Sequence, residues 1–137
     1  MLAHILSIIG YTGATLLVQG SSHFLVNKAH YDAITYDHEQ PIVALGISSM
    51  LIQGAILTYA FTRFMPNDGS LKSALSLAWM FGAFLLSYMA LAHAGKYPVP
   101  SISGWIWTET WVAAIQFTLI GVVLWAAHHF AGSSTSI

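Results

Sequence analysis

Long apolar runs alternate with short polar segments along this chain, and the runs set the first expectation about its fold. A helix that crosses a bilayer needs roughly 20 mostly apolar residues. Four stretches meet this requirement, at approximately residues 2–22, 42–64, 71–94 and 105–130. All four prolines lie between the stretches rather than inside them. The pattern therefore predicts an all-α chain with four membrane spans.

The segments between the spans contain the residues expected at helix ends. Pro41 precedes the second span, where a first helical turn tolerates proline. The sequence MPNDGS at residues 65–70 predicts a tight turn with a capping Asp68 or Ser70, and Gly95 is a typical helix stop. Because short connections join antiparallel neighbours, we expect a single domain over residues 1–137. Its fold would be an integral membrane four-helix bundle with both termini on the same side.

The composition of the chain excludes an ordinary soluble domain. Charged residues make up 7% of the chain and hydrophobic residues 56%, whereas a typical soluble domain has about 25% charged residues. So few charges could not cover the surface of a soluble fold. The net charge of −1 gives no indication of nucleic-acid binding. The absence of cysteine excludes disulfides, thiolate metal sites and cysteine nucleophiles, and the lipid bilayer is the expected surrounding.

The two ends of the predicted bundle differ slightly in charge. The chain begins directly with an apolar run and lacks a basic leader, so we interpret this run as a retained first span. Arg63, Lys72 and the amino terminus would lie on one side, and Lys28 and Lys96 on the other. The positive-inside rule therefore favours termini in the cytoplasm. Aromatic residues at the opposite side fit an interfacial belt: Tyr97, Trp105, Trp107 and Trp111.

Small residues recur at four-residue spacing within two of the spans. In the third span these are Ala74, Ala78 and Gly82, and in the second they are Gly46 and Gly54. Small side chains allow helices to approach closely in lipid, where apolar area alone drives little association. The spacing predicts helix-packing seams at these five positions.

Ionisable and metal-ligating residues gather at one predicted membrane face, because the first and third connections open on the same side. The candidate ligands are His23, His30, His38, His93 and Glu109. Zinc, copper and iron all accept imidazole and carboxylate ligands. His23 and His30 are seven residues apart, about 10 Å along a straight helix, so both could bind one ion only if the helix bent.

Two ligand combinations therefore remain open for a metal site. One joins His23 with His93 and Glu109, and the other joins His30 with the Asp-His-Glu sequence at residues 37–39. No compact motif such as HExxH is present. The alternative interpretation is that these histidines are simply polar residues at the membrane interface. Haem is not expected, because the possible histidine pairs lie at the extreme ends of the spans.

Glu109 and three glutamines lie inside predicted spans. An ionised carboxylate is costly there and usually has a partner, for which His93 and Lys96 are the natural candidates. Glu109 would then serve either as a structural tether or as a proton-accepting or ligand-binding group. Hydrogen bonds between helices are expected for the glutamines: Gln19, Gln53 and Gln116.

Much of the chain resembles a known group of proteins. The resemblance rests on three segments, QGSSHFLVNKAHYDAITYDHEQPIVALG, GSLKSALSLAWMFGAFLLSYMALAHAGKYP and TETWVAAIQFTLIGVVLW. In layout these are similar to small bacterial four-span membrane proteins of unknown function. The resemblance implies a compact four-helix bundle in a bacterial inner (plasma) membrane, and it supplies no catalytic residues.

Two functions follow as hypotheses from these observations. The first is a structural or accessory subunit that packs against other integral membrane proteins, or against itself, through its small-residue seams. The second is a metal-binding or redox membrane protein with a His/Glu site at one membrane face. No arrangement of serine, histidine and acid indicates a hydrolase, and the sequence favours a role other than catalysis.

Overall fold

The computed structural model describes residues 1–34, 42–65 and 69–132 of the chain. His38 and the acidic residues beside it, which sequence analysis grouped with a possible metal site, lie outside the described residues. The described part is helical apart from short turns and contains no strand. The prediction of an all-α chain is confirmed.

Four helical rods make up the described structure. Their elements are α1 (Leu2–Ser21) with the π-helical segment η1 (Ser22–Val26), the short α2 (Lys28–Asp32), α3 (Val43–Phe64), α4 (Leu71–Leu86) with the π-helical η2 (Ser87–Ala92) and α5 (His93–Lys96), and α6 (Ile102–Gly132). Four of these stretches are long and apolar enough to cross a membrane: Leu2–Val26, Val43–Phe64, Leu71–Lys96 and Ile102–Ala131. The predicted number of such helices is also confirmed.

Two helix ends differ from the predicted boundaries. The last helix begins at Ile102, three residues earlier than predicted, because Ser101 caps it: the Gly104 amide donates to the Ser101 hydroxyl at 3.1 Å. The third rod continues past Gly95 to Lys96 and ends before Pro98. Gly95 does not adopt the positive φ that usually makes glycine a helix stop.

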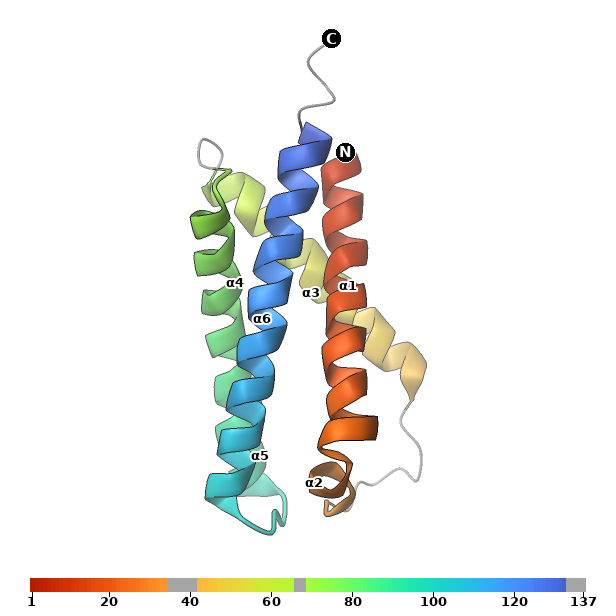
Figure 1. Ribbon diagram of the computed structural model, residues 1–137, viewed down its shortest axis with the longest axis vertical. Helices are drawn as coiled ribbons and strands as arrows, with labels where there is room; N and C mark the ends of the chain where they lie inside the picture. The colour runs from red at the N-terminus through yellow and green to blue at the C-terminus, as the bar shows by residue number, and fades with distance from the viewer. Residues whose placement is uncertain (35–41, 66–68, 133–137) are drawn as a thin grey trace.

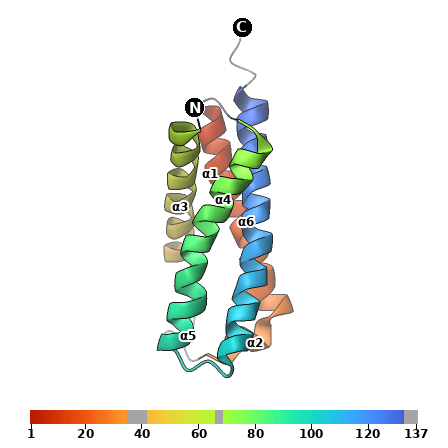
Figure 2. The same cartoon turned by 90° about the vertical axis from the view of Figure 1, so that its left-hand side faces the viewer.

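The rods pack around α6, which contacts α1 on one side and α4 on the other (Figure 1). The rings of His4 in α1 and His128 in α6 lie 5.6 Å apart at one end of the bundle. Further along, Gln19 donates a hydrogen bond to Gln116. Helix α3 crosses obliquely behind α1, and its start diverges from the other rods (Figures 1 and 2). All residues from 42 to 49 are consequently exposed.

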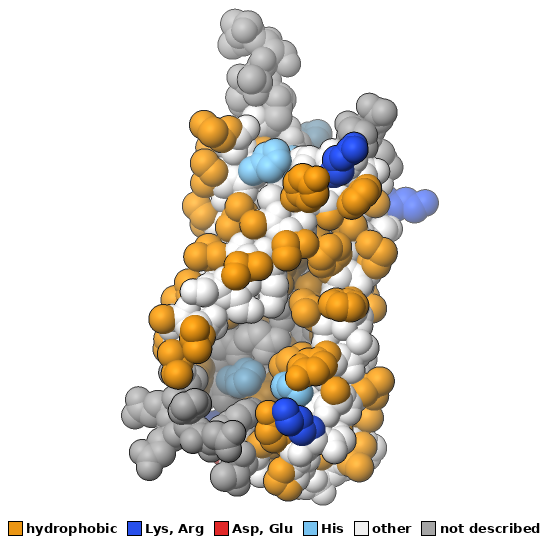
Figure 3. Space-filling model, turned by 180° about the vertical axis from the view of Figure 1, so that it is seen from behind, with side chains coloured by type: hydrophobic (Ala, Val, Ile, Leu, Met, Phe, Trp, Pro, Cys, Tyr) orange, Lys and Arg blue, Asp and Glu red, His pale blue; other side chains and the backbone are white. Residues whose placement is uncertain are grey.

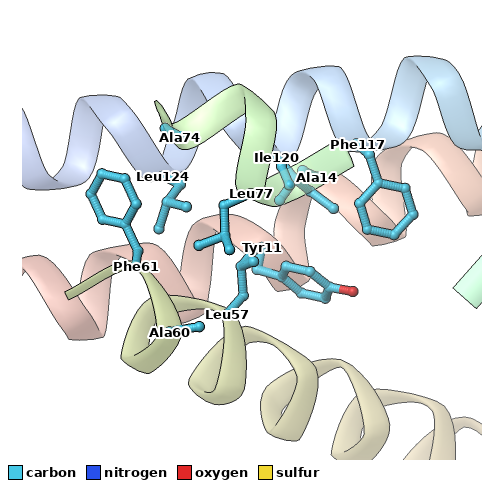
Figure 4. Close-up of a cluster of buried hydrophobic side chains, with 11 residues drawn as sticks. Tyr11, Ala14, Leu57, Ala60, Phe61, Ala74, Leu77, Phe117, Ile120 and Leu124 are labelled. Atoms are coloured by element: carbon cyan, nitrogen blue, oxygen red, sulfur yellow. The ribbon is translucent and has the colours of Figure 1, made fainter. Parts of the chain in front are cut away.

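The main core lies where all four rods meet (Figure 4). Its buried side chains are Tyr11, Ala14, Leu57, Ala60, Phe61, Ala74, Leu77, Ala78, Phe117, Ile120 and Leu124. Ala74 and Ala78 are fully buried, and a Cβ atom on Gly82 would lie only 2.5 Å from the Phe117 ring. A Cβ on Gly54 would lie 3.2 Å from Tyr11. Small residues therefore do allow close helix approach at four of the five predicted positions.

Gly46 is the position at which the structure departs from the predicted seam. It lies in the diverging half of α3, is exposed, and has no neighbouring atom within 4 Å of the place where a Cβ would be. The four-residue rhythm that joins it to Gly54 does not bring it into the bundle, because α3 crosses α1 at an angle and its buried residues begin only at Gly54. Gly46 makes no helix contact within the described chain.

A second cluster fastens α2 onto the ends of α5 and α6. Tyr31 and Ile34 pack there against Ala94 and Trp105. The expectation that Trp105 belongs to an exposed aromatic belt is wrong: it is only 3% exposed. Its indole nitrogen donates to the carbonyl of Met89, in η2, at 3.0 Å. Burial of the ring with its polar atom satisfied makes Trp105 a structural anchor for this end of the bundle.

Charged side chains lie near the two ends of the bundle. Figure 3 shows the face that carries α3, with hydrophobic side chains along its height and Lys, Arg and His side chains toward its ends. Arg63 and Lys72 lie where α3 ends and α4 begins, while Lys28 and Lys96 belong to α2 and α5. An apolar band between two polar rims is the pattern of surfaces that face lipid.

Candidate functional site

The two π-helical segments mark the end of the bundle where the unusual polar residues lie. Segment η1 interrupts the first rod just before α2, and η2 interrupts the third rod just before α5. Each segment lies next to a short helix that packs against Trp105: α2 follows η1, and α5 follows η2. Single π-helical turns are rare and occur frequently at functional sites.

Glu109 is the most deeply placed ionisable group of this end. It lies seven residues into α6 and is 5% exposed. Its Oε1 atom is 3.8 Å from Nε2 of His30, which is too long for a direct hydrogen bond. Both of these atoms are buried and have no hydrogen-bond partner among the described residues. The carboxyl group does have a second neighbour, the hydroxyl of Tyr31, which is its hydrogen-bond partner.

Aromatic rings enclose this acid–base pair. The His30 ring stacks on Trp105 with centroids 4.5 Å apart and planes tilted by 13°, and it meets Tyr31 edge-on at 5.0 Å. His23 stacks on the Tyr31 ring, with the two ring centroids 3.6 Å apart. His30 lies outside the span-length helices, and burial lowers its pKa from the ordinary value of 6.5 because it disfavours the charged ring.

The partner of Glu109 differs from the expected ones. Sequence analysis suggested His93 and Lys96, but His93 lies edge-on to Tyr88 and Tyr97 in α5 and its surroundings. The Lys96 ammonium lies 5.6 Å from the centre of the Tyr97 ring. His30 reaches Glu109 because the first rod does not continue as a straight helix: it passes through η1 and breaks at Asn27, and α2 then packs against α6.

The described residues bring together only part of the expected metal-ligand set. His30 and Glu109 meet as a pair, and His23 is joined to them through Tyr31. Across residues 1–34, 42–65 and 69–132, no group of three His, Cys, Asp or Glu side chains is placed to hold one metal ion. Within the described residues, His30 and Glu109 form an acid–base pair. Binding of zinc, copper or iron stays a prediction of the sequence.

A polar face runs along the first rod, from the start of α1 to the first residue of η1. Its residues recur at intervals of three or four, which places them on one side of a helix: His4, Ser7, Tyr11, Thr15, Gln19 and Ser22. Four of the six are buried against the neighbouring helices, namely Ser7, Tyr11, Thr15 and Ser22. We call this set the polar seam. An inward-facing stripe of this kind is unusual in a helix that is apolar enough to cross a membrane.

Hydrogen bonds connect the polar seam to α6 and α3. Gln19 donates to the Gln116 carbonyl at 2.6 Å, and Gln116 donates to the Thr15 hydroxyl at 3.3 Å. On the other side, the Tyr11 hydroxyl donates to Gln53 of α3 at 2.6 Å. All three glutamines expected to bond between helices thus lie in such bonds. At the end of the seam, the Ser22 and Tyr31 hydroxyls lie 3.4 Å apart, and Tyr31 bonds Glu109, so the seam continues into the surroundings of the carboxyl group.

The opposite end of the seam carries a smaller polar group. The Thr58 hydroxyl and Nε2 of His128 are 3.1 Å apart, and the His4 ring lies edge-on to His128. Ser7, one turn from His4, is buried, and its hydroxyl has no partner among the described residues. Sequence analysis did not identify Ser7, Tyr11, Thr15 or Tyr31, although the spacing of the first three was visible in the sequence.

Comparison of the chain with models of protein families, with curated proteins and with solved structures found no match in any of the three.

Proposed function

We propose that this chain is a multi-pass membrane protein that acts as an accessory subunit and binds another membrane-spanning helix through the exposed half of α3. The four rods would cross a bacterial inner membrane as antiparallel neighbours with both termini on the cytoplasmic side. Support for insertion comes from the four span-length apolar helices and from the placement of charged residues near the bundle ends. The observation that carries the accessory role is the environment of Gly46.

Glycines inside the bundle allow neighbouring helices to pack closely. An added Cβ would meet Phe117 at Gly82, Tyr11 at Gly54 and Leu75 at Gly121, with distances of 2.5, 3.2 and 2.8 Å respectively. Gly46 has nothing within 4 Å. Glycine within a helix costs about 1 kcal/mol relative to alanine, and Gly46, the fourth residue of α3, has no neighbour in the chain's own packing that would explain it.

A partner helix would supply that explanation. Ser49, which is three residues further along α3 and on the same side of the helix as Gly46, is also small and exposed. Small residues at helix contacts let two backbones approach closely, which is the main source of helix association in lipid. The expected partner is therefore an apolar helix, from another integral membrane protein or from a second copy of this chain.

A crosslinking experiment tests this role. The chain has no native cysteine, so a photoreactive maleimide can be attached at Ile47→Cys alone in native membranes. We expect one adduct of defined mass, which also distinguishes a second copy from another protein. Gly46→Leu should reduce its yield about tenfold, which corresponds to about 1.4 kcal/mol of lost association free energy.

Gly13→Leu is the matched control, since Gly13 is likewise exposed and has no neighbour within 4 Å, but lies on α1. It should leave the adduct at full yield. Absence of any adduct from Ile47→Cys, or equal loss in both leucine variants, would contradict a specific contact at α3.

Cysteine labelling also tests the proposed orientation. Gly69 and Gly95 are both exposed and open around their Cα atoms, and they lie at opposite ends of the bundle. In intact cells, a membrane-impermeant maleimide should label Gly95→Cys and leave Gly69→Cys unlabelled until the cells are opened. The reverse pattern would place the termini outside, and labelling of both would contradict insertion.

A further inference from the structure

The polar seam and the Glu109 pair share a feature that packing alone does not explain. Three buried side-chain atoms have no hydrogen-bond partner among the described residues, and they are the Ser7 hydroxyl, His30 Nε2 and Glu109 Oε1. Ser7 belongs to the polar seam, and the other two form the acid–base pair at its end. A buried polar group without a partner costs roughly 1–3 kcal/mol. Two such atoms, 3.8 Å apart, indicate a site that binds and releases a small species.

Charge considerations identify the exchanged species. An ionised Glu109 would be a nearly fully buried carboxylate in an apolar rod, a situation that is expensive without a compensating charge. The pair can avoid this cost in two ways, by placing a proton on the carboxylate or by placing it on His30. Both arrangements hold one proton between the two groups, and neither leaves a net charge on the pair.

We propose that Glu109 and His30 form a reversible proton-binding site, in which His30 takes a proton from the α2 end of the bundle and passes it to Glu109. This inference does not depend on the accessory role. His30 is suited to the outer position, because its side chain is 20% exposed against 6% for Glu109. Histidine side chains also reach the surface near the ends of the bundle (Figure 3).

The transfer balances without any further reactant. His30 accepts a proton from water at Nδ1, the ring nitrogen that does not face Glu109, and the ring becomes imidazolium. The proton on the buried Nε2 then moves to Oε1 of the Glu109 carboxylate once a side-chain rotation shortens the 3.8 Å separation, which leaves a neutral carboxylic acid and a neutral imidazole protonated at Nδ1. Release is the same sequence reversed.

Several other ionisable groups surround the pair. Tyr31 of α2 bonds the carboxyl group, and His23 of η1 stacks on Tyr31. From α5 and the residue after it come His93, Lys96 and Tyr97, which contact one another. Lys28 and Asp32 of α2 pair with each other on the outer surface. Of the described residues, His30 is the basic group placed to share a proton with Glu109 directly.

The test uses a convenient property of the sequence. Glu39 and Glu109 are its two glutamates, so Glu39→Gln leaves Glu109 as the single glutamate. This chain, labelled with carboxyl-¹³C glutamate and held in lipid nanodiscs, reports Glu109 protonation by NMR as a function of pH. His30 is followed in the same sample through its ring ¹⁵N signals.

We expect Glu109 and His30 to titrate together, since strongly interacting groups share their transitions. His30→Gln should shift the Glu109 transition by about one pH unit or more. His93→Gln is the control, because His93 contacts Tyr88 and Tyr97 instead, and it should leave the transition in place. Glu109→Gln should remove the carboxyl signal and restore simple one-step titration to His30.

Three outcomes would overturn the inference. The first is a Glu109 signal that does not change across the pH range in which the protein stays folded. The second is a Glu109 transition that His30→Gln leaves unmoved. The third is a stoichiometric metal ion that is lost in both His30→Gln and Glu109→Gln, because the pair would then be part of a metal centre. The labelled Glu39→Gln chain keeps both groups of the pair, so the first outcome is decided even if the other variants do not fold.

Discussion

Gly82→Ala is the substitution whose cost follows most directly from the structure. The added methyl carbon would lie 2.5 Å from Cγ and 2.6 Å from Cδ2 of Phe117. Ordinary contacts begin at 3.4 Å, so the overlap is roughly 0.9 Å. Phe117 is 4% exposed and belongs to the main core, so its ring has no free space to enter. Overpacking of this kind costs about 1–3 kcal/mol.

A second glycine supplies the reference for this measurement. Gly46→Ala gains the same helix propensity as Gly82→Ala, and it adds a methyl group where nothing lies within 4 Å. Comparison of the two variants therefore cancels the propensity gain, which is about 1 kcal/mol in water. We expect Gly82→Ala to have a free energy of unfolding about 1–3 kcal/mol below that of Gly46→Ala.

Reversible unfolding by sodium dodecyl sulfate in mixed micelles, followed by circular dichroism, measures this difference. Phe117→Ala removes the ring atoms that the new methyl group meets. In that background the penalty of Gly82→Ala should shrink, with an interaction energy of about 0.5–3 kcal/mol. If Gly82→Ala is as stable as Gly46→Ala, then α4 and α6 do not pack as described.

Three further outcomes are expected. Gln116→Leu removes hydrogen bonds between α6 and α1, and should lower the free energy of unfolding by about 0.5–2 kcal/mol in the same assay; an unchanged value would show that the bonds contribute nothing. Tyr11→Phe removes the 2.6 Å bond to Gln53 and the side-chain bond with Thr15, so it should cost about 0.6 kcal/mol for each bond lost. Burial lowers the pKa of His30, and Trp105→Ala uncovers the ring and should raise that pKa toward 6.5 in an NMR titration. A lower or unmoved value would mean that Trp105 is not what buries it.

The number and extent of the helices could be predicted because membrane spans need only length and low polarity. The packing positions Gly54 and Gly82 could be predicted as well, since close helix approach requires small residues. Gly46 shows the limit of that argument. Both faces of a span are apolar, so a rhythm of small residues does not reveal which members face the bundle and which face outward.

The partner of Glu109 could not be read from the sequence for a different reason. The expected separation of about 10 Å between His23 and His30 assumes a continuous, straight α-helix. The first rod instead passes through η1 and breaks at Asn27, whose φ of −114° and ψ of 25° lie outside the helical range. The burial of Tyr31 and Ile34 against Trp105 then fixes α2. These contacts join residues more than 70 positions apart, and periodicity along one helix cannot reveal such contacts.

In two of the rods, a π-helical segment lies between a long α-helix and a short helix that packs at the polar end of the bundle. A π-helical turn accommodates about one residue more than an α-helical turn, so removing one residue from η2 would let it close as ordinary α-helix. Because the extra residue is the one removed, Ala94 would stay close to its place against Trp105, and the rod would stay long enough to traverse a bilayer. In a purely α-helical segment the same deletion would rotate everything after it by roughly 100° about the rod axis. The polar end can therefore absorb at η2 a change in length that would dismantle it elsewhere.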